Sequence, residues 1–173
     1  LIGLEMCWRQ HQPALDAFVY GDEERGGGDV ELLAKRVYWD RVWGYPIDLY
    51  ADILGYARDN KLRLCGLNVP YPIVRAVSRA GLEGLPQDVR NAMPPLDVDI
   101  GDVEHKRRFA EAIGGGLEVD GETLIPPAGD GVHGSMSVEA CQRMYEAQAL
   151  WDDYMASSIA GYVSAEPKEG AGV

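Results

Sequence analysis

Two short apolar runs, residues 1–7 (LIGLEMC) and 61–70 (KLRLCGLNVP), decide the fold class expected of this chain. Each run is shorter than an ordinary helix and suits a strand in the interior of a sheet. Pro70 ends the second run, because proline cannot continue a central ladder. We therefore expect two buried strands.

Helix signals recur between and after these runs, namely capping residues, prolines in first turns and apolar residues at helical spacing. They predict helices over residues 12–20, 30–39, 46–60, 71–81, 102–113 and 137–163. Strands separated by helices are typical of an α/β fold, here a parallel-type sheet with flanking helices.

We expect one α/β domain over residues 1–163, with a Gly-rich inserted loop at about residues 114–131 and a flexible tail over 164–173. A chain of 173 residues with 46% hydrophobic positions can bury a sizeable core. Because Leu1 already belongs to an apolar run without a preceding turn, we expect the chain to be part of a longer precursor and its domain to be incomplete.

Charge and cysteine content exclude several classes of function. The formal net charge of -12 argues against binding nucleic acid through phosphates. No run approaches the roughly 18 apolar residues of a membrane-spanning helix. Cys7, Cys65 and Cys141 form no C-x-x-C pair and are expected to be buried small hydrophobes.

Three motif-like segments do not meet the requirements of the sites they resemble. GDGVHG (129–134) does not follow a strand, as a dinucleotide site requires, and LDVDIGDVE (96–104) lacks calcium ligands at the EF-hand positions. ERGGGD (24–29) lacks the Lys and Ser or Thr of a phosphate loop. His105 is expected on a helix surface.

The last predicted helix carries two polar residues on an otherwise apolar face. Gln148 and Asp152 lie on this face, and burying either without a partner would cost about 1–3 kcal/mol. We therefore expect partners from other site residues or a ligand. The apolar members of the face are Cys141, Met144, Tyr145, Met155, Ile159 and Tyr162. Glu139 and Glu146 are expected on the solvent side.

Further polar residues stand where the predicted strands end. Glu5 lies near the end of the first strand and Asn68 closes the second, and ligands of open α/β sheets bind beyond the carboxyl ends of parallel strands. We predict that Glu5, Asn68, Gln148 and Asp152 line one crevice. His11, directly after the first strand, is either a crevice residue or a capping or surface residue, and His133 is a second candidate ligand.

The sequence blocks resemble, in order, those of the ChaN-like haem-binding uptake family of the Tiki and erythromycin-esterase-like superfamily. The blocks are GLEMCWRQHQPALDAFVYG, WDRVWGYPIDLYADILGYARDNKLRLCGLNVP, VSRAGLEGL and HGSMSVEACQRMYEAQALWDDYMASSIAGYV. The resemblance puts these residues on motif positions: Glu5, Asn68, His133, Gln148, Asp152 and Met155. The chain lacks the family's opening strand with its G-E-x-H signature and the strands that should follow the last helix.

The resemblance implies an α/β protein of haem or iron handling. It places such a protein in plastids of plants and algae or, as a membrane-anchored lipoprotein, in the bacterial periplasm. The expected ligand is a tetrapyrrole, held by a His or Tyr iron ligand such as His133, with a protein partner or second copy covering the incomplete sheet. Taken singly, the tryptophans Trp39, Trp43 and Trp151 are ordinary core residues.

Two other functions remain open. The first is a non-catalytic interaction subunit of a larger assembly, because missing strands would leave sheet edges for another chain. The second is a metal-dependent hydrolase like distant members of the superfamily. Glu5 and Asp152 are then the catalytic candidates, as ligands of a divalent metal or as general base, and Asn68 or Gln148 orients the substrate.

Overall fold

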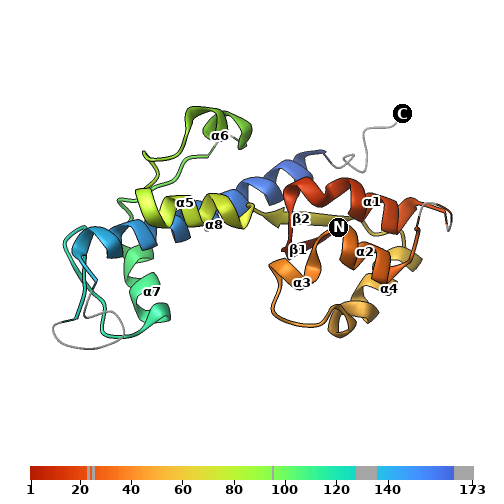
Figure 1. Cartoon of the computed structure of the whole chain (residues 1–173), viewed down its shortest axis with the longest axis horizontal. Helices are drawn as coiled ribbons and strands as arrows, with labels where there is room; N and C mark the ends of the chain where they lie inside the picture. The colour runs from red at the N-terminus through yellow and green to blue at the C-terminus, as the bar shows by residue number, and fades with distance from the viewer. Residues whose placement is uncertain (23, 25, 95, 128–135, 166–173) are drawn as a thin grey trace, which may run out of the picture. The chain divides into compact units, whose positions relative to one another are not determined.

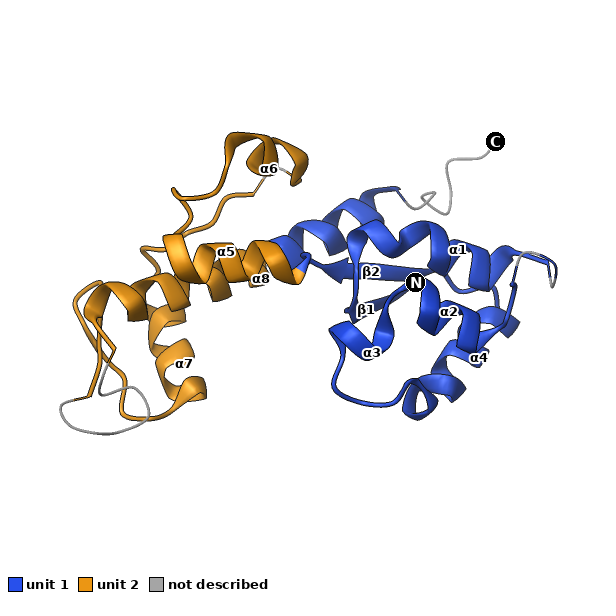
Figure 2. Cartoon of the chain, viewed as in Figure 1, with its two compact units in different colours: residues 1–70, 154–173 blue, residues 71–153 orange. Residues whose placement is uncertain are grey.

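The computed structural model describes residues 1–22, 24, 26–94, 96–127 and 136–165 (Figure 1). These residues form two compact units, residues 1–70 with 154–173, and residues 71–153 (Figure 2). The sequence analysis expected one domain over 1–163, and each unit is described here by itself. Among the described residues, no helix is both long and apolar enough to cross a bilayer.

Unit 1 is a two-stranded parallel sheet with helices packed on it. Its elements are β1 (Ile2–Trp8), η1 (Arg9–His11), α1 (Gln12–Tyr20), α2 (Val30–Arg36), α3 (Trp39–Val42), η3 (Ile47–Tyr50), α4 (Ala51–Asp59), β2 (Leu64–Asn68) and the end of α8 (Val138–Ala165). β1 and β2 pair in parallel, with Ile2 opposite Leu64. The α/β class and the parallel pair expected from the sequence are thus confirmed.

Local signals in the sequence account for these elements. Asp29 accepts a hydrogen bond from the Leu32 N–H at 2.8 Å and caps α2, as its position predicts. α2 ends at Arg36, three residues earlier than expected, because Tyr38 adopts a left-handed conformation with φ of 54°. The core of unit 1 contains Leu4, Leu15, Phe18, Trp39, Leu54 and Leu64, so the core assignment of Trp39 is confirmed.

The edge of β2 that faces away from β1 is closed by side chains. Backbone groups of a parallel strand alternate between its two edges, and the Ile2 N–H bonds to the Arg63 carbonyl, so Leu64 and Gly66 point the other way. There the Gln12 amide donates to the Leu64 carbonyl at 2.8 Å and accepts from the Gly66 N–H at 3.1 Å. Tyr162 donates its hydroxyl to the Gly66 carbonyl at 3.2 Å.

Unit 2 packs helices and a small hairpin around the first part of α8. Its other elements are α5 (Tyr71–Ala80), α6 (Gln87–Ala92), α7 (Val103–Ile113), β3 (Glu118–Asp120) and β4 (Thr123–Ile125). β3 and β4 pair antiparallel within the stretch expected to be an inserted loop. Gly121, with φ of 58°, permits the turn between them. Ser137 caps α8 as predicted, its Oγ accepting from the Ala140 N–H at 3.2 Å.

Three expectations about side-chain exposure are corrected by the structure. Ile159, assigned to the apolar face of the last helix, is 45% exposed. Glu146, assigned to the solvent side, is half-buried and accepts a hydrogen bond from the Leu82 N–H at 2.8 Å. The buried side of α8 is wider than the predicted stripe, because neighbouring chain segments cover it, and it includes Ala147, Leu150 and Tyr154.

Candidate functional site

The carboxyl ends of β1 and β2 bring together two of the predicted site residues. The pairing register shifts between Leu4 and Trp8, after which Trp8 lies opposite Asn68. The Asn68 side-chain amide donates to the backbone carbonyl of Glu5 at 2.8 Å, whereas the side chain of Glu5 lies on the exposed part of β1. Asn68 thus contacts Glu5 through the main chain, and the bond anchors its side chain where the strands end.

Gly66 permits the turn that follows β1. An added Cβ at Gly66 would lie 2.4 Å from the carbonyl oxygen of Trp8, so any larger residue would push the backbone of Trp8 away. This close approach of the two backbones allows η1 to begin at the sheet edge. His11 is the last residue of η1 and packs against Trp8, the last residue of β1.

His11 is buried, and its Nδ1 accepts a hydrogen bond from the main chain. Only 6% of the residue is exposed, which excludes the surface position considered from the sequence. The Trp8 N–H donates to Nδ1 of His11 at 3.2 Å, and the two rings stack with centroids 5.0 Å apart. Burial lowers the pKa of His11 below its usual 6.5. The neutral ring therefore carries its proton on Nε2.

Two buried polar atoms at this place have no hydrogen-bond partner among the described residues. They are Nε2 of His11, a donor, and Oδ1 of Asn68, an acceptor. Leaving such a group unpaired costs about 1–3 kcal/mol, and in native proteins a water molecule or a ligand usually supplies the partner. Both residues neighbour Trp8, Asn68 as its partner in the sheet and His11 as its stacking partner, so we take the carboxyl ends of the strands as the candidate binding site.

A pocket of about 340 Å³ opens beside His11. Its walls are Gln10, His11, Pro13, Ala14 and Arg36, so an imidazole, an amide and a guanidinium border it. The volume lies at the lower end of the range for small-molecule sites. Its polar groups suit a ligand that carries negative charge.

Tyr38 adds a phenol to this neighbourhood. Its ring centroid lies 6.2 Å from that of His11, and the Arg41 guanidinium lies 5.9 Å from its ring centre. The side chain is 54% exposed, and the left-handed backbone is unusual for a bulky residue. Such conformations cluster at functional sites. The sequence pattern missed Tyr38 as a site residue because nothing in it signals a left-handed residue between two helices.

The amide and acid of α8 find their partners in unit 2. Gln148 donates to Oδ1 of Asp152 at 2.9 Å, and Nε2 of His105 lies 3.1 Å from Oδ2 of Asp152. The Tyr145 hydroxyl lies 3.0 Å from Nδ1 of His105. His105, expected to be an ordinary surface residue, is therefore part of a polar network. Gln148 and Asp152, the two polar residues on the apolar face of α8, thus bond to each other, and Asp152 also contacts His105 of α7.

The buried hydroxyl of Tyr145 stays protonated in this network. Burial, with smaller contributions from Asp102, Asp99 and Asp152, raises the pKa of Tyr145. The hydroxyl therefore remains protonated near neutral pH and can donate to His105 or, at 3.4 Å, to the Asp102 carbonyl. These hydrogen bonds fasten α7 to α8.

The remaining predicted site residues fall elsewhere. Met155 is half-buried and packs against Cys65, Leu67 and Tyr162 in unit 1. His133 lies outside the described residues. Within the described parts of the chain, no three His, Cys, Asp or Glu side chains converge as metal ligands do. The three cysteines are buried, as expected, and form no disulfide with one another, and burial raises the pKa of the Cys7 thiol to about 12.

Comparison with known proteins gives one match. The family model described as haem-binding uptake, Tiki superfamily, ChaN matches residues 1–173. No curated protein and no solved structure matches the chain.

Proposed function

Because the chain belongs to the haem-binding uptake family of the Tiki superfamily, the ChaN family, we propose that it binds haem and acts in haem or iron handling. The observation that supports a site in this chain is the buried, unpartnered Nε2 of His11 beside the exposed phenol of Tyr38. Both residues lie in unit 1, and their rings are neighbours.

The donor atoms at this place fit haem. Tyrosine is one of the residues that hold haem iron, and the phenol of Tyr38 is accessible. His11 fits as a hydrogen-bond donor rather than as an iron ligand, because the Trp8 amide occupies Nδ1 and leaves the proton on Nε2. Arg36 and Gln10, on the pocket wall, are suited to a haem propionate. When bound, haem would supply iron and an apolar macrocycle.

A hemin titration followed by visible absorbance tests the proposal. We expect a saturable Soret shift with the unmodified chain, loss or marked displacement of that band with Tyr38→Phe, and weaker binding with His11→Asn. Tyr56→Phe is the matched control, because Tyr56 is 60% exposed on α4. His133→Ala tests the residue chosen from the sequence. The absence of any saturable Soret change would overturn haem binding, and equal spectra for Tyr38→Phe and Tyr56→Phe would exclude Tyr38 as the ligand.

A second candidate function is an interaction subunit, and one observation favours it. Leu49, Ile53 and Tyr56 are 71%, 44% and 60% exposed and repeat at helical spacing along η3 and α4. Exposed apolar groups in such a row suit a protein interface. Sedimentation analysis would test this: concentration-dependent association that Ile53→Glu abolishes is the expected result. A monomer at all concentrations would remove the support for self-association.

The hydrolase hypothesis has less support from the described residues. Both carboxylate oxygens of Asp152 are engaged, one with Gln148 and the other with His105. Glu5 is exposed, and no hydrogen bond or ion pair joins its side chain to another described residue. Bound divalent metal at equimolar ratio in the purified chain, lost in Asp152→Asn, would revive the hypothesis.

A further inference from the structure

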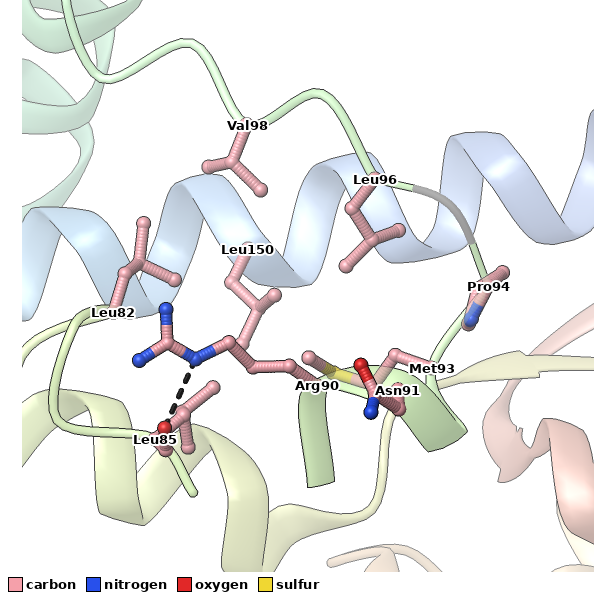
Figure 3. A pocket seen from close by; sticks show the side chains of 9 residues that line it. All are labelled: Leu82, Leu85, Arg90, Asn91, Met93, Pro94, Leu96, Val98 and Leu150. Atoms are coloured by element: carbon pink, nitrogen blue, oxygen red, sulfur yellow. Dashed lines mark hydrogen bonds between the residues drawn. The ribbon is translucent and has the colours of Figure 1, made fainter. Parts of the chain in front are cut away.

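Unit 2 contains a pocket of about 340 Å³ with apolar walls (Figure 3). The walls come from the turn after α5, from the segment after α6 and from α8. Besides Pro94, the apolar residues are Leu82, Leu85, Met93, Leu96, Val98 and Leu150. Five of these six are aliphatic side chains of Leu or Val, which suit a hydrocarbon group. Such a surface alone does not select a ligand, so the polar residues of the pocket decide its chemistry.

Arg90 of α6 places a positive charge along one side of this pocket. Its side chain runs toward Leu82 and Leu85 in Figure 3. Nε donates to the Leu85 carbonyl at 2.9 Å and Nη2 donates to the Glu83 carbonyl at 2.6 Å. These two bonds fix the plane of the guanidinium before any ligand arrives, which lowers the entropy cost of binding. Nη1 donates to none of the described residues and remains available.

Asn91 supplies a second donor at the same pocket. Its Oδ1 accepts from the Gln87 side-chain amide at 2.9 Å, which orients the Asn91 amide and leaves its NH₂ group to donate. No Asp or Glu side chain is among the described residues that line this pocket. In a chain with net charge -12, a pocket with one cation, one amide donor and no lining acid is selective for an anion.

We propose that this pocket binds small amphipathic carboxylates, with the hydrocarbon body against the aliphatic walls and the carboxylate on the guanidinium of Arg90. Guanidinium and carboxylate groups form strong charge-assisted hydrogen bonds, which distinguish the acid from an alcohol of equal length. An alkyl amine is excluded, because its charge has the same sign as that of Arg90. The proposal does not depend on haem binding, because its residues belong to unit 2 and those proposed for haem belong to unit 1.

Calorimetric titration of the full chain with octanoate tests the proposal, with octanol and octylamine as comparison ligands. We expect saturable binding of octanoate, weaker binding of octanol and none of octylamine. Arg90→Gln should weaken octanoate binding about tenfold or more, as expected for loss of a hydrogen bond to a charged group. Arg79→Gln is the matched control, because Arg79 is exposed on α5 outside the pocket.

Asn91→Asp provides a second variant in case Arg90→Gln loosens the turn that Arg90 holds. The exposed Asn91 can become a carboxylate of the same shape without disturbing the core, and its negative charge on the pocket wall would repel the carboxylate of the ligand. We expect a similar loss of octanoate affinity, with an unchanged circular dichroism spectrum. Unaltered octanoate affinity in this variant, no saturable binding by the unmodified chain, or equal binding of octylamine would each overturn the proposal.

Hemin is also an amphipathic carboxylate, so a further measurement separates the two sites. Arg90→Gln should leave the Soret titration unchanged, and saturating octanoate should not displace hemin. If octanoate displaced hemin, the two ligands would share one site, and the proposal of a separate carboxylate pocket would be wrong. Failure of hemin to bind while octanoate binds would overturn only the proposed function.

Discussion

The backbone N–H of Trp8 donates a hydrogen bond to Nδ1 of His11 at 3.2 Å, and the indole ring of the same residue stacks on the imidazole. Trp8 therefore decides both the orientation of His11 and its tautomer. The proton on Nε2 faces a place where no described residue accepts it. Nε2 of His11 is therefore a hydrogen-bond donor available to a ligand or a water molecule at the end of the sheet.

Stability should depend on His11 as the pH falls. Burial holds the pKa of folded His11 below the 6.5 of the unfolded chain, so the unfolded chain binds the proton more readily. The free energy of unfolding should therefore fall as the pH drops through 6.5 toward the lower folded-state pKa. Urea unfolding at a series of pH values measures this slope.

The control for this pH dependence is His11→Asn, whose side-chain oxygen can still accept from the Trp8 N–H but does not titrate in this range. The variant should lose less stability on acidification than the unmodified chain. Identical slopes for the two proteins would show that His11 is not the group responsible. Nitrogen NMR shifts of His11 should report a proton on Nε2 at neutral pH.

Replacing Gln12 by Met should destabilise unit 1. The Gln12 amide bonds to two backbone groups of β2, and Met would leave the Leu64 carbonyl and the Gly66 N–H without their partner. We expect a loss of about 1–3 kcal/mol in the free energy of unfolding, measured by urea denaturation. Gln10→Met is the matched control, because Gln10 is exposed, and equal stability of the two variants would contradict the role of Gln12.

Alanine at two glycines should act in opposite directions. At Gly66 the new Cβ would lie 2.4 Å from the Trp8 carbonyl oxygen, so Gly66→Ala should cost about 1–3 kcal/mol through displaced backbone. At Gly55, inside α4, a Cβ meets nothing within 4 Å. Gly55→Ala should stabilise by about 0.5–1 kcal/mol. Thermal unfolding of both variants checks the prediction, which stabilisation by Gly66→Ala would refute.

The contact between His105 and Asp152 should contribute modestly to the packing of α7 on α8. The two side chains are 35% and 40% exposed, and at such positions an ion pair is worth about 0.2–1 kcal/mol. A double-mutant cycle with His105→Gln and Asp152→Asn, read by chemical denaturation, isolates the coupling energy. Strictly additive effects of the two substitutions would show that the contact contributes nothing.

The sequence alone determined the local features of this protein. The bounds of α1, the Asp29 cap of α2, the Ser137 cap of α8 and the buried strand β2 depend on residues a few positions apart, so their patterns are legible without a fold. The family match likewise follows from the order of residues along the chain. The sequence also identified Gln148 and Asp152 as polar groups that require partners.

Only the tertiary structure decided which partners these are. His105 lies 47 positions before Asp152, and Gln12 lies 54 positions before Gly66, so neither contact has a local signature. Three further features also depend on the tertiary structure: the left-handed backbone of Tyr38, the Nε2–H tautomer of His11 and the pocket beside Arg90. Helices and caps are stabilised by neighbours in sequence, whereas burial, pairing of polar groups and pockets arise where distant segments meet, and these features form the candidate sites.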